Sequence, residues 1–288
     1  MEESKKISFR QKNPTICPIC KNEFFREEMF TGSGRLIAEK ITDELRRLYK
    51  ESQKFGKIYP LAYTLNVCPN CLYTAYPKDF NDITDDEIAK LHEMRSARKN
   101  AVAKFFGQLN FNEDRNLILG AASFMLAVDC YSFRRKNVSP TFKKGVSAIR
   151  AAWLFSDLAE EYPDQPYKKL SFFFYKKAYE YYLTILNLLQ NGGEPADAAG
   201  NMGPDTDRNW GYEGILYVSA VLTVKYGTTE KDLSKRIENF NISKRYLSRL
   251  FGAGKTSKNT PTELLEKTRI LFEKINGMIE QWEGEMES

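Results

Sequence analysis

The sequence predicts a mainly α-helical protein: an α-helical array, or α-solenoid, that follows a small N-terminal zinc-ribbon-like module with a helical insert. Two Cys-Pro-x-Cys turns lie within the first 71 residues. After Phe80, apolar residues recur at helical spacing, in segments joined by short turns. We therefore divide the 288 residues into a zinc-binding module at 1–82 and a helical domain at 83–288.

The two cysteine turns are Cys17-Pro18-Ile19-Cys20 and Cys68-Pro69-Asn70-Cys71. Each turn brings two sulfurs to one side, and its proline stiffens the turn by fixing φ. Together they supply four thiolates, which is the full ligand set of one tetrahedral zinc. Such a closed set leaves no position for water or substrate. We therefore expect one structural Zn²⁺ bound by Cys17, Cys20, Cys68 and Cys71.

Thiol redox chemistry and a pair of disulfides are the alternatives for these cysteines. A thioredoxin-like motif would begin a helix inside a βαβ unit, and no such pattern surrounds Cys17. Disulfides suit exported proteins, and the first residues lack the apolar segment of a secretory signal. The longest apolar run, at 117–128, is shorter than a membrane span. We expect a cytoplasmic protein without a membrane partner.

The segment between the turns, residues 21–67, is longer than the roughly 15–20 residues usual in ribbon-type sites. A helix from Leu36 to Phe55, ended by Gly56, would account for the excess. The periodicity behind this expectation comes from Leu36, Ile37, Ile41, Leu45 and Leu48.

Seven helices are expected after Phe80. Two have clear starting signals, a capping box at Thr84–Glu87 and the Ser139-Pro140 pair, in which Ser139 would be the N-cap. Cys130 lies among apolar residues and is expected to be a buried small hydrophobe rather than a reactive thiol. The expected helices cover about 84–106, 113–135, 140–161, 168–190, 212–226, 230–252 and 260–282.

Residues 216–227, followed by Thr-Thr-Glu-Lys, resemble the helix–Gly–helix phrase of a tetratricopeptide repeat (TPR). The segments 142–161 and 168–190 form a weaker copy of the same phrase. Neither matches every marker position of the repeat. The predicted array is therefore TPR-like and degenerate.

Two short motifs suggest ligands that the sequence does not support. Gly252-Ala-Gly-Lys-Thr256 ends like a P-loop. Arg249, however, occupies the position of the first glycine that a P-loop requires, and the segment follows an expected helix rather than a strand. Asp205, Asp207 and Asn209 imitate an EF-hand, but the turn glycine is replaced by Trp210. With a single histidine, His92, multi-histidine metal catalysis is also excluded.

The second cysteine turn and its flanks resemble a bacterial family known as domain of unknown function 2225. The residues that carry the resemblance are Pro60, Tyr63, Val67, Cys68, Pro69, Cys71, Tyr73, Ala75, Asp79 and Phe80. It extends into the C-terminal half through Tyr217, Gly227, Lys244, Tyr246, Leu247 and Gly252. The resemblance implies a zinc-binding N-terminal module joined to a TPR-like helical array, and no particular activity.

The leading hypothesis is a non-enzymatic protein–protein interaction or scaffold protein, because a helical array offers a binding surface and no catalytic set is present. The expected partner is a protein or peptide. The residues predicted to line its groove are Trp153, Tyr175, Tyr179, Tyr217 and Lys225.

The alternative is a nucleic-acid-associated regulatory zinc protein. The net charge of +5 permits an anionic partner without requiring one. An enzyme is the third hypothesis, and it depends only on the long irregular segment at 191–211. The basic stripe that would bind nucleic acid comprises Arg95, Arg98, Lys99, Lys104, Arg134, Arg135, Lys136, Lys143 and Lys144.

Overall fold

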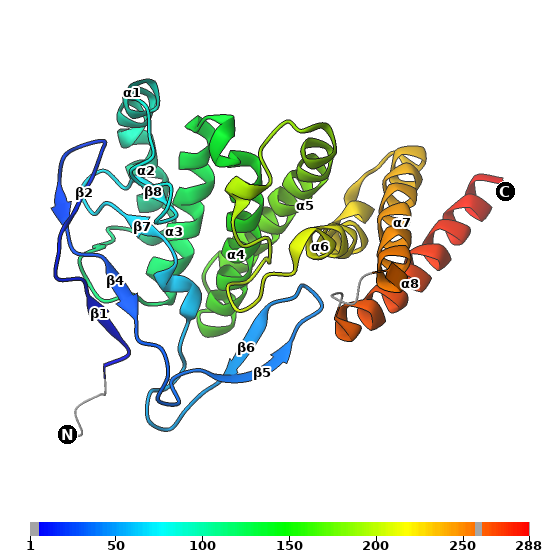
Figure 1. The fold of residues 1–288 in the computed structure, drawn as a ribbon, viewed down its shortest axis with the longest axis horizontal. Helices are drawn as coiled ribbons and strands as arrows, with labels where there is room; N and C mark the ends of the chain where they lie inside the picture. Colours follow the sequence, from blue (N-terminus) through cyan, green and yellow to red (C-terminus); the bar gives the residue numbers. More distant parts are fainter. Residues whose placement is uncertain (1–5, 257–260, 288) are drawn as a thin grey trace.

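The computed structural model describes residues 6–256 and 261–287. In these ranges, short antiparallel strands precede a series of eight α-helices (Figure 1). The strands form two-stranded sheets that pair β1 with β4, β2 with β3, β5 with β6 and β7 with β8. Their bounds are β1 Ser8–Arg10, β2 Thr15–Ile16, β3 Glu23–Phe24, β4 Glu27–Met29, β5 Ile37–Ile41, β6 Arg47–Lys50, β7 Asn66–Val67 and β8 Thr74–Ala75.

The helices confirm the prediction of a mainly helical protein. The expected helix at 84–106 is divided at Met94, which ends one helix and precedes the next. Thr260, the expected cap of the last helix, lies outside the described residues. The helices are α1 Asp85–Glu93, α2 Arg95–Phe106, α3 Leu117–Cys130, α4 Pro140–Glu161, α5 Tyr167–Asn191, α6 Gly211–Tyr226, α7 Leu233–Thr256 and α8 Thr262–Glu287.

From α3 to α8, each helix packs against the next one in the sequence, so the helices form a row across Figure 1. A large hydrophobic cluster includes residues from Cys17 to Trp282, and both predicted domains contribute to it. The division at 82 and 83 stays a prediction. None of the helices within the described ranges is long and apolar enough to cross a bilayer.

The helical insert expected at Leu36–Phe55 is wrong, because this segment is the β5–β6 hairpin. Of the apolar residues that suggested a helix, Leu45 is the one that is fully buried, and Ile37 is 43% exposed. The hairpin turn closes when the Leu45 N–H donates to the Thr42 carbonyl oxygen at 3.1 Å. Leu45 has a φ of +61°, which an α-helix does not allow. Contacts made by the turn with distant helices therefore outweigh the local periodicity.

The start of α4 also differs from the prediction. Pro140 is its first residue, as expected, but Ser139 has a φ of +50° and does not cap the helix. The Ser139 hydroxyl instead donates to the Pro195 carbonyl oxygen at 2.5 Å. The Glu194 carboxylate accepts the Thr141 N–H at 3.0 Å and takes over the capping role. The irregular segment 191–211 is thus attached to the start of α4.

Candidate metal centre

The two cysteine turns have the same local structure. In the first, the Lys21 N–H donates to the Cys17 carbonyl oxygen at 2.9 Å, and in the second the Leu72 N–H donates to that of Cys68 at 2.9 Å. Lys21 and Leu72 both have positive φ values, of 60° and 58°. One turn joins β2 to β3 and the other joins β7 to β8. Two hairpin turns of the same local structure therefore carry the four cysteines.

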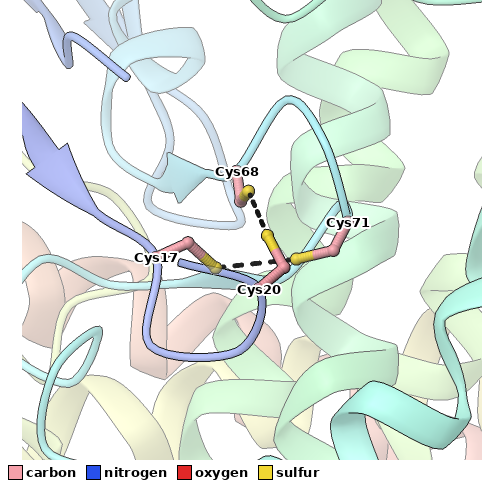
Figure 2. Close-up of side chains that lie close together, drawn as sticks. All are labelled: Cys17, Cys20, Cys68 and Cys71. Atoms are coloured by element: carbon pink, nitrogen blue, oxygen red, sulfur yellow. Dashed lines mark hydrogen bonds between the residues drawn. The ribbon is translucent and has the colours of Figure 1, made fainter. Parts of the chain in front are cut away.

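The four sulfurs converge on one point between these turns (Figure 2). Cys17 Sγ lies 3.6 Å from Cys71 Sγ, and Cys20 Sγ lies 3.5 Å from Cys68 Sγ. All four sulfurs lie within 4.8 Å of one another. Four thiolates at about 2.3 Å from a tetrahedral zinc would be about 3.8 Å apart. The cluster therefore has the dimensions of a four-thiolate metal site, and these residues could bind a metal ion.

Polar groups around the sulfurs donate hydrogen bonds that stabilise the thiolate form of the cysteines. The Asn70 side-chain amide donates to Cys20 Sγ at 3.6 Å. Arg95 holds that amide in place, because its Nη2 donates to the Asn70 Oδ1 at 2.7 Å. Hydrogen bonds from the Cys17 and Cys71 side chains, and after them the backbone N–H groups of Cys71 and Asn70, lower the pKa of Cys68. Hydrogen bonds of this kind stabilise metal-bound thiolates and orient them.

Arg98 supplies a buried positive charge near the cluster. It is 2% exposed, and its Nη2 donates to the Cys71 carbonyl oxygen at 3.4 Å. Its Nε and Nη1 atoms have no hydrogen-bond partner among the described residues. Four thiolates around a divalent cation carry a net charge of −2. A neighbouring guanidinium offsets part of this charge, so its position fits an occupied site.

As free thiols, the sulfurs share protons unequally. The hydrogen bond with Cys68 raises the pKa of Cys17, and hydrogen bonds from Cys17 and Cys71 lower the pKa of Cys68. Hydrogen bonds with both of these neighbours raise the pKa of Cys71. All four can be thiolates only when a cation replaces the protons, so metal binding releases protons.

Cys130 is separate from this cluster. It is 1% exposed, and burial raises the pKa of its thiol to about 12. Its sulfur accepts the Thr74 N–H at 3.4 Å. The prediction of a buried, unreactive cysteine agrees with this environment.

The five residues predicted to line a partner groove do not form an open surface. They lie on α4, α5 and α6, but Trp153 is only 1% exposed and Tyr217 only 2% exposed. Tyr179 is half-buried, and its hydroxyl has no hydrogen-bond partner among the described residues. Trp153 and Tyr217 are therefore out of reach of a partner while this face is covered by another part of the same chain, and the assignment of the five residues to a partner groove stays a prediction.

The covering segment is the tip of the β5–β6 hairpin. Its Glu44 carboxylate accepts hydrogen bonds from Trp153 Nε1, from the Tyr175 hydroxyl at 2.8 Å and from Lys225 Nζ at 2.7 Å. The three donors come from α4, α5 and α6, respectively. The next residue, Leu45, is 0% exposed. The sequence analysis assigned these three donors to a partner protein. It did not identify Glu44 as their acceptor, because Glu44 lies in a segment expected to be helical.

Two arginines hold the rest of the tip. Arg46 forms a two-pronged ion pair with Asp157 on α4, through Nη1 at 3.0 Å and through Nη2. Arg47 donates its N–H to Asp205 at 2.8 Å and its Nε to Asp207 at 2.9 Å. The acidic residues that imitate an EF-hand thus bind the hairpin, which accounts for their presence in this loop.

The basic stripe proposed for nucleic acid is interrupted by burial. Arg98, Arg134 and Lys143 are each less than 8% exposed. Arg134 Nε pairs with Glu87 at 3.2 Å, and Lys143 Nζ pairs with Asp79 at 2.5 Å. These three residues are therefore buried and are not part of an exposed basic surface.

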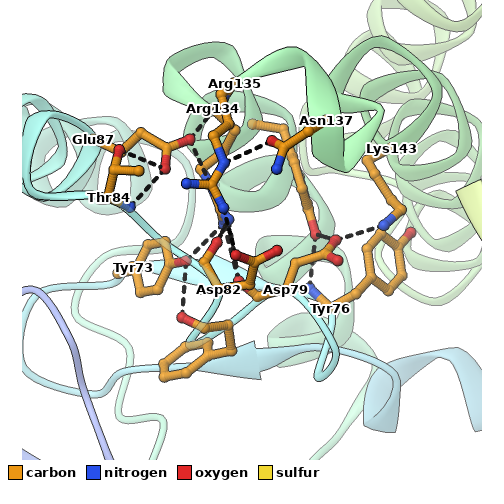
Figure 3. A network of polar contacts seen from close by, with 12 residues as sticks. Tyr73, Tyr76, Asp79, Asp82, Thr84, Glu87, Arg134, Arg135, Asn137 and Lys143 are labelled. Carbon is orange, nitrogen blue, oxygen red and sulfur yellow. Dashed lines mark hydrogen bonds and ion pairs between the residues drawn. The ribbon is translucent and has the colours of Figure 1, made fainter. Parts of the chain in front are cut away.

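A buried polar network links the second cysteine turn to the helices (Figure 3). The Asp79 carboxylate accepts hydrogen bonds from the Tyr131 hydroxyl at 2.5 Å and from Lys143. Arg134 donates to the Tyr73 hydroxyl at 2.9 Å and to the Asp79 carbonyl oxygen at 3.2 Å. Sequence reasoning gave Asp79 no structural role, although it is among the residues that carry the family resemblance.

Comparisons with known proteins agree with that resemblance. Residues 11–275 match the family described as an uncharacterized protein conserved in bacteria, DUF2225. An uncharacterized protein of Borreliella burgdorferi is 40% identical over 272 residues, which cover 94% of this chain and 97% of that relative. No solved structure is similar enough to be matched. The resemblance is therefore confirmed, and the chain belongs to the DUF2225 family.

Proposed function

We propose that this protein is a non-enzymatic protein–protein interaction or scaffold protein whose helical array binds an acidic segment of a partner. The observation that carries the proposal is the convergence of three donors from three helices on one carboxylate, that of Glu44. We call the surface formed by Trp153, Tyr175, Tyr217 and Lys225 the hairpin-facing surface.

The proposal includes a TPR-like array as its architecture. The packing of α4 on α5 and of α6 on α7 supports it, because these pairs coincide with the two repeat-like segments of the sequence. An array of helix pairs presents a long face built from several helices. The hairpin-facing surface is such a face, because α4, α5 and α6 each contribute a donor to it.

The proposal also includes one structural Zn²⁺ in the four-cysteine centre. Thiolate ligands and tetrahedral dimensions favour zinc over hard cations such as Mg²⁺ or Ca²⁺. A closed ligand set leaves no coordination position for a substrate. The metal would therefore stabilise the two small hairpins, which are too short to be stable alone.

The chemistry of the hairpin-facing surface specifies the partner segment. An indole N–H, a phenol O–H and an ammonium together recognise a carboxylate, and the neighbouring buried position accepts a leucine side chain. The fitting segment is an acidic residue followed by a large apolar residue in a tight turn. The chain's own hairpin tip supplies such a segment, and a partner would displace it. The apparent affinity of the partner would be low, because the tip is released in only a small fraction of the molecules.

The proposal is tested with a variant in which residues 43–46 are replaced by Gly-Asn-Gly-Ser, called the open variant. A labelled peptide of residues 37–50 should bind the open variant and not the wild-type protein. Adding Lys225→Met to the open variant should weaken peptide binding by about tenfold or more, because it removes a charge-assisted hydrogen bond. Lys168→Met removes an exposed lysine of α5 and is the matched control. Peptide binding that is absent, or unaffected by Lys225→Met, would overturn the proposal.

The natural partner is then sought by cross-linking mass spectrometry with the open variant, with and without its Lys225→Met substitution. A protein that requires Lys225 and survives nuclease treatment supports the interaction hypothesis. Bound material that nuclease removes entirely would move the function to nucleic acid, which is the alternative from the sequence.

A further inference from the structure

A cavity of about 430 Å³ lies between the start of the helical array and the irregular segment after α5. Its walls come from the Tyr76–Lys78 segment, from one face of α4 and from residues 198–201 and 206. The cavity lies apart from the four-cysteine centre and from the residues of the hairpin-facing surface. Its volume is within the range of about 300–1,000 Å³ that small-molecule sites occupy.

One face of α4 gives this cavity a cationic and an apolar part. Lys143, Val146 and Arg150 follow one another at helical spacings and all line the cavity. Phe142 and Ala199 add apolar wall, and both are buried. The site therefore combines a large apolar surface with a few converging polar groups, as ligand sites do.

Arg150 is buried without a carboxylate partner. It is 4% exposed, and none of the ion pairs found among the described residues involves it. Its Nε donates to the Pro204 carbonyl oxygen at 2.7 Å, and its Nη1 donates to the Tyr76 hydroxyl at 3.2 Å. Its Nη2 forms no hydrogen bond within the described part of the chain and is not among the fully buried atoms. A buried guanidinium normally has an anionic partner, because burying an unpaired charge is unfavourable.

The neighbouring charges do not supply that partner. Lys143 is paired with Asp79, and the same carboxylate also accepts the Tyr131 hydroxyl. Exposed Lys78 adds a further positive charge to the cavity lining. The rings of Tyr76 and Phe124 lie 5.8 Å and 5.9 Å from the Arg150 guanidinium, and such contacts compensate the charge only in part.

We propose that this cavity binds a small organic carboxylate, with the carboxylate on Arg150 and Lys78 and its apolar body against Phe142, Val146 and Ala199. The planar guanidinium matches a carboxylate through paired N–H donors. One water occupies about 30 Å³ in the liquid, so a ligand of about 10–15 non-hydrogen atoms fits the cavity. The apolar walls favour such a ligand over inorganic phosphate.

The test compares octanoate, 1-octanol and inorganic phosphate by titration calorimetry and ligand-observed NMR on the full-length protein. Octanoate should bind at least about tenfold more tightly than 1-octanol, which shares its chain but lacks the charge. Arg150→Gln should weaken octanoate binding by about tenfold or more, and Lys78→Ala by a smaller factor. Lys90→Ala, which removes an exposed lysine of α1, should change nothing.

A further variant keeps the test decisive if Arg150→Gln fails to fold. Ala198→Phe places a ring in the cavity from a half-buried position of its wall and should abolish octanoate binding. Equal binding of 1-octanol and octanoate, preferential binding of phosphate, or no binding of octanoate would each overturn the proposal. Octanoate binding that persists in the Ala198→Phe variant would also overturn it, and Arg150 would then serve only to hold the Pro204 loop.

Discussion

The Glu44 carboxylate, at the tip of the β5–β6 hairpin, accepts a hydrogen bond from the Lys225 ammonium at 2.7 Å across 181 residues of sequence. The Glu44 side chain is 7% exposed, whereas that of Lys225 is 43% exposed. The pair therefore joins a buried acceptor to a partly exposed donor in the last turn of α6. This contact is one of several that hold the hairpin tip over the hairpin-facing surface.

We predict that Glu44→Ala destabilises the protein. The substitution leaves the Trp153 N–H and the Tyr175 hydroxyl without their acceptor, and each buried unsatisfied group costs about 1–3 kcal/mol. We expect a loss of about 2–4 kcal/mol in the free energy of unfolding, measured by urea denaturation. Glu39→Ala, at an exposed position of β5, is the control and should change stability by less than about 0.5 kcal/mol. Equal effects of the two substitutions would contradict the structural role of Glu44.

We predict that the four-cysteine centre binds one metal ion per chain and that Cys71→Ser removes it. Elemental analysis should give one zinc for the wild-type protein and little for the variant. A loss of about 4 kcal/mol of metal-linked stability would lower the Tm by roughly 8–16 °C. Cys130→Ala removes the cysteine outside the cluster and should keep the metal. Retention of zinc by Cys71→Ser, or its loss from Cys130→Ala, would show that the ligand set is wrong.

Gly120 provides a test of packing between α3 and the short 3₁₀ helix Pro60–Tyr63. A Cβ atom at this position would lie 2.9 Å from Ala62 Cβ and 3.1 Å from Ala62 Cα. We expect Gly120→Ala to destabilise the protein by about 1–3 kcal/mol, although alanine favours helices. Gly277→Ala in α8 is the matched control, because a Cβ there meets nothing within 4 Å. It should stabilise the protein by up to about 1 kcal/mol, and a stabilising Gly120→Ala would contradict the close packing.

Glu87 gives stability a dependence on pH. Burial raises the pKa of its carboxyl. Hydrogen bonds from the Thr84 and Arg135 N–H groups and the charge of Arg134 lower this pKa by a larger amount, so the net shift is downward. Because the folded pKa lies below the unfolded value of about 4.3, this stabilisation is complete above that value. It is lost as the pH falls through the folded pKa. Glu87→Gln should therefore reduce the loss of stability on acidification.

Urea unfolding at pH 7, 5, 4 and 3 measures this effect. Glu93→Gln, at an exposed position of the same helix, should leave the pH dependence as in the wild-type protein. An unchanged slope in the Glu87→Gln variant would show that Glu87 does not contribute to acid sensitivity.

Local signals in the sequence predicted most of the helices after Phe80 and the clustering of the four cysteines. The capping box at Thr84 starts α1 as predicted, since the Glu87 carboxylate accepts the Thr84 N–H at 2.9 Å. The repeated Cys-Pro-x-Cys turn fixed which sulfurs come together, because its spacing is itself the geometry of a zinc ligand pair. Such features depend on neighbours within a few residues, so they are visible without the fold.

Tertiary structure decided what the insert does. The spacing of Leu36, Ile37 and Ile41 suggested a helix. Leu45 nevertheless adopts a left-handed conformation, because burial of the hairpin tip stabilises it. The partners of Glu44 lie more than 100 residues away in the chain. No local pattern encodes such contacts, because packing of α4, α5 and α6 creates the site that the tip fills. The sequence by itself therefore determined most of the helices and the four cysteines that could bind a metal ion. Only the tertiary structure showed that the chain's own hairpin covers residues predicted to line a groove.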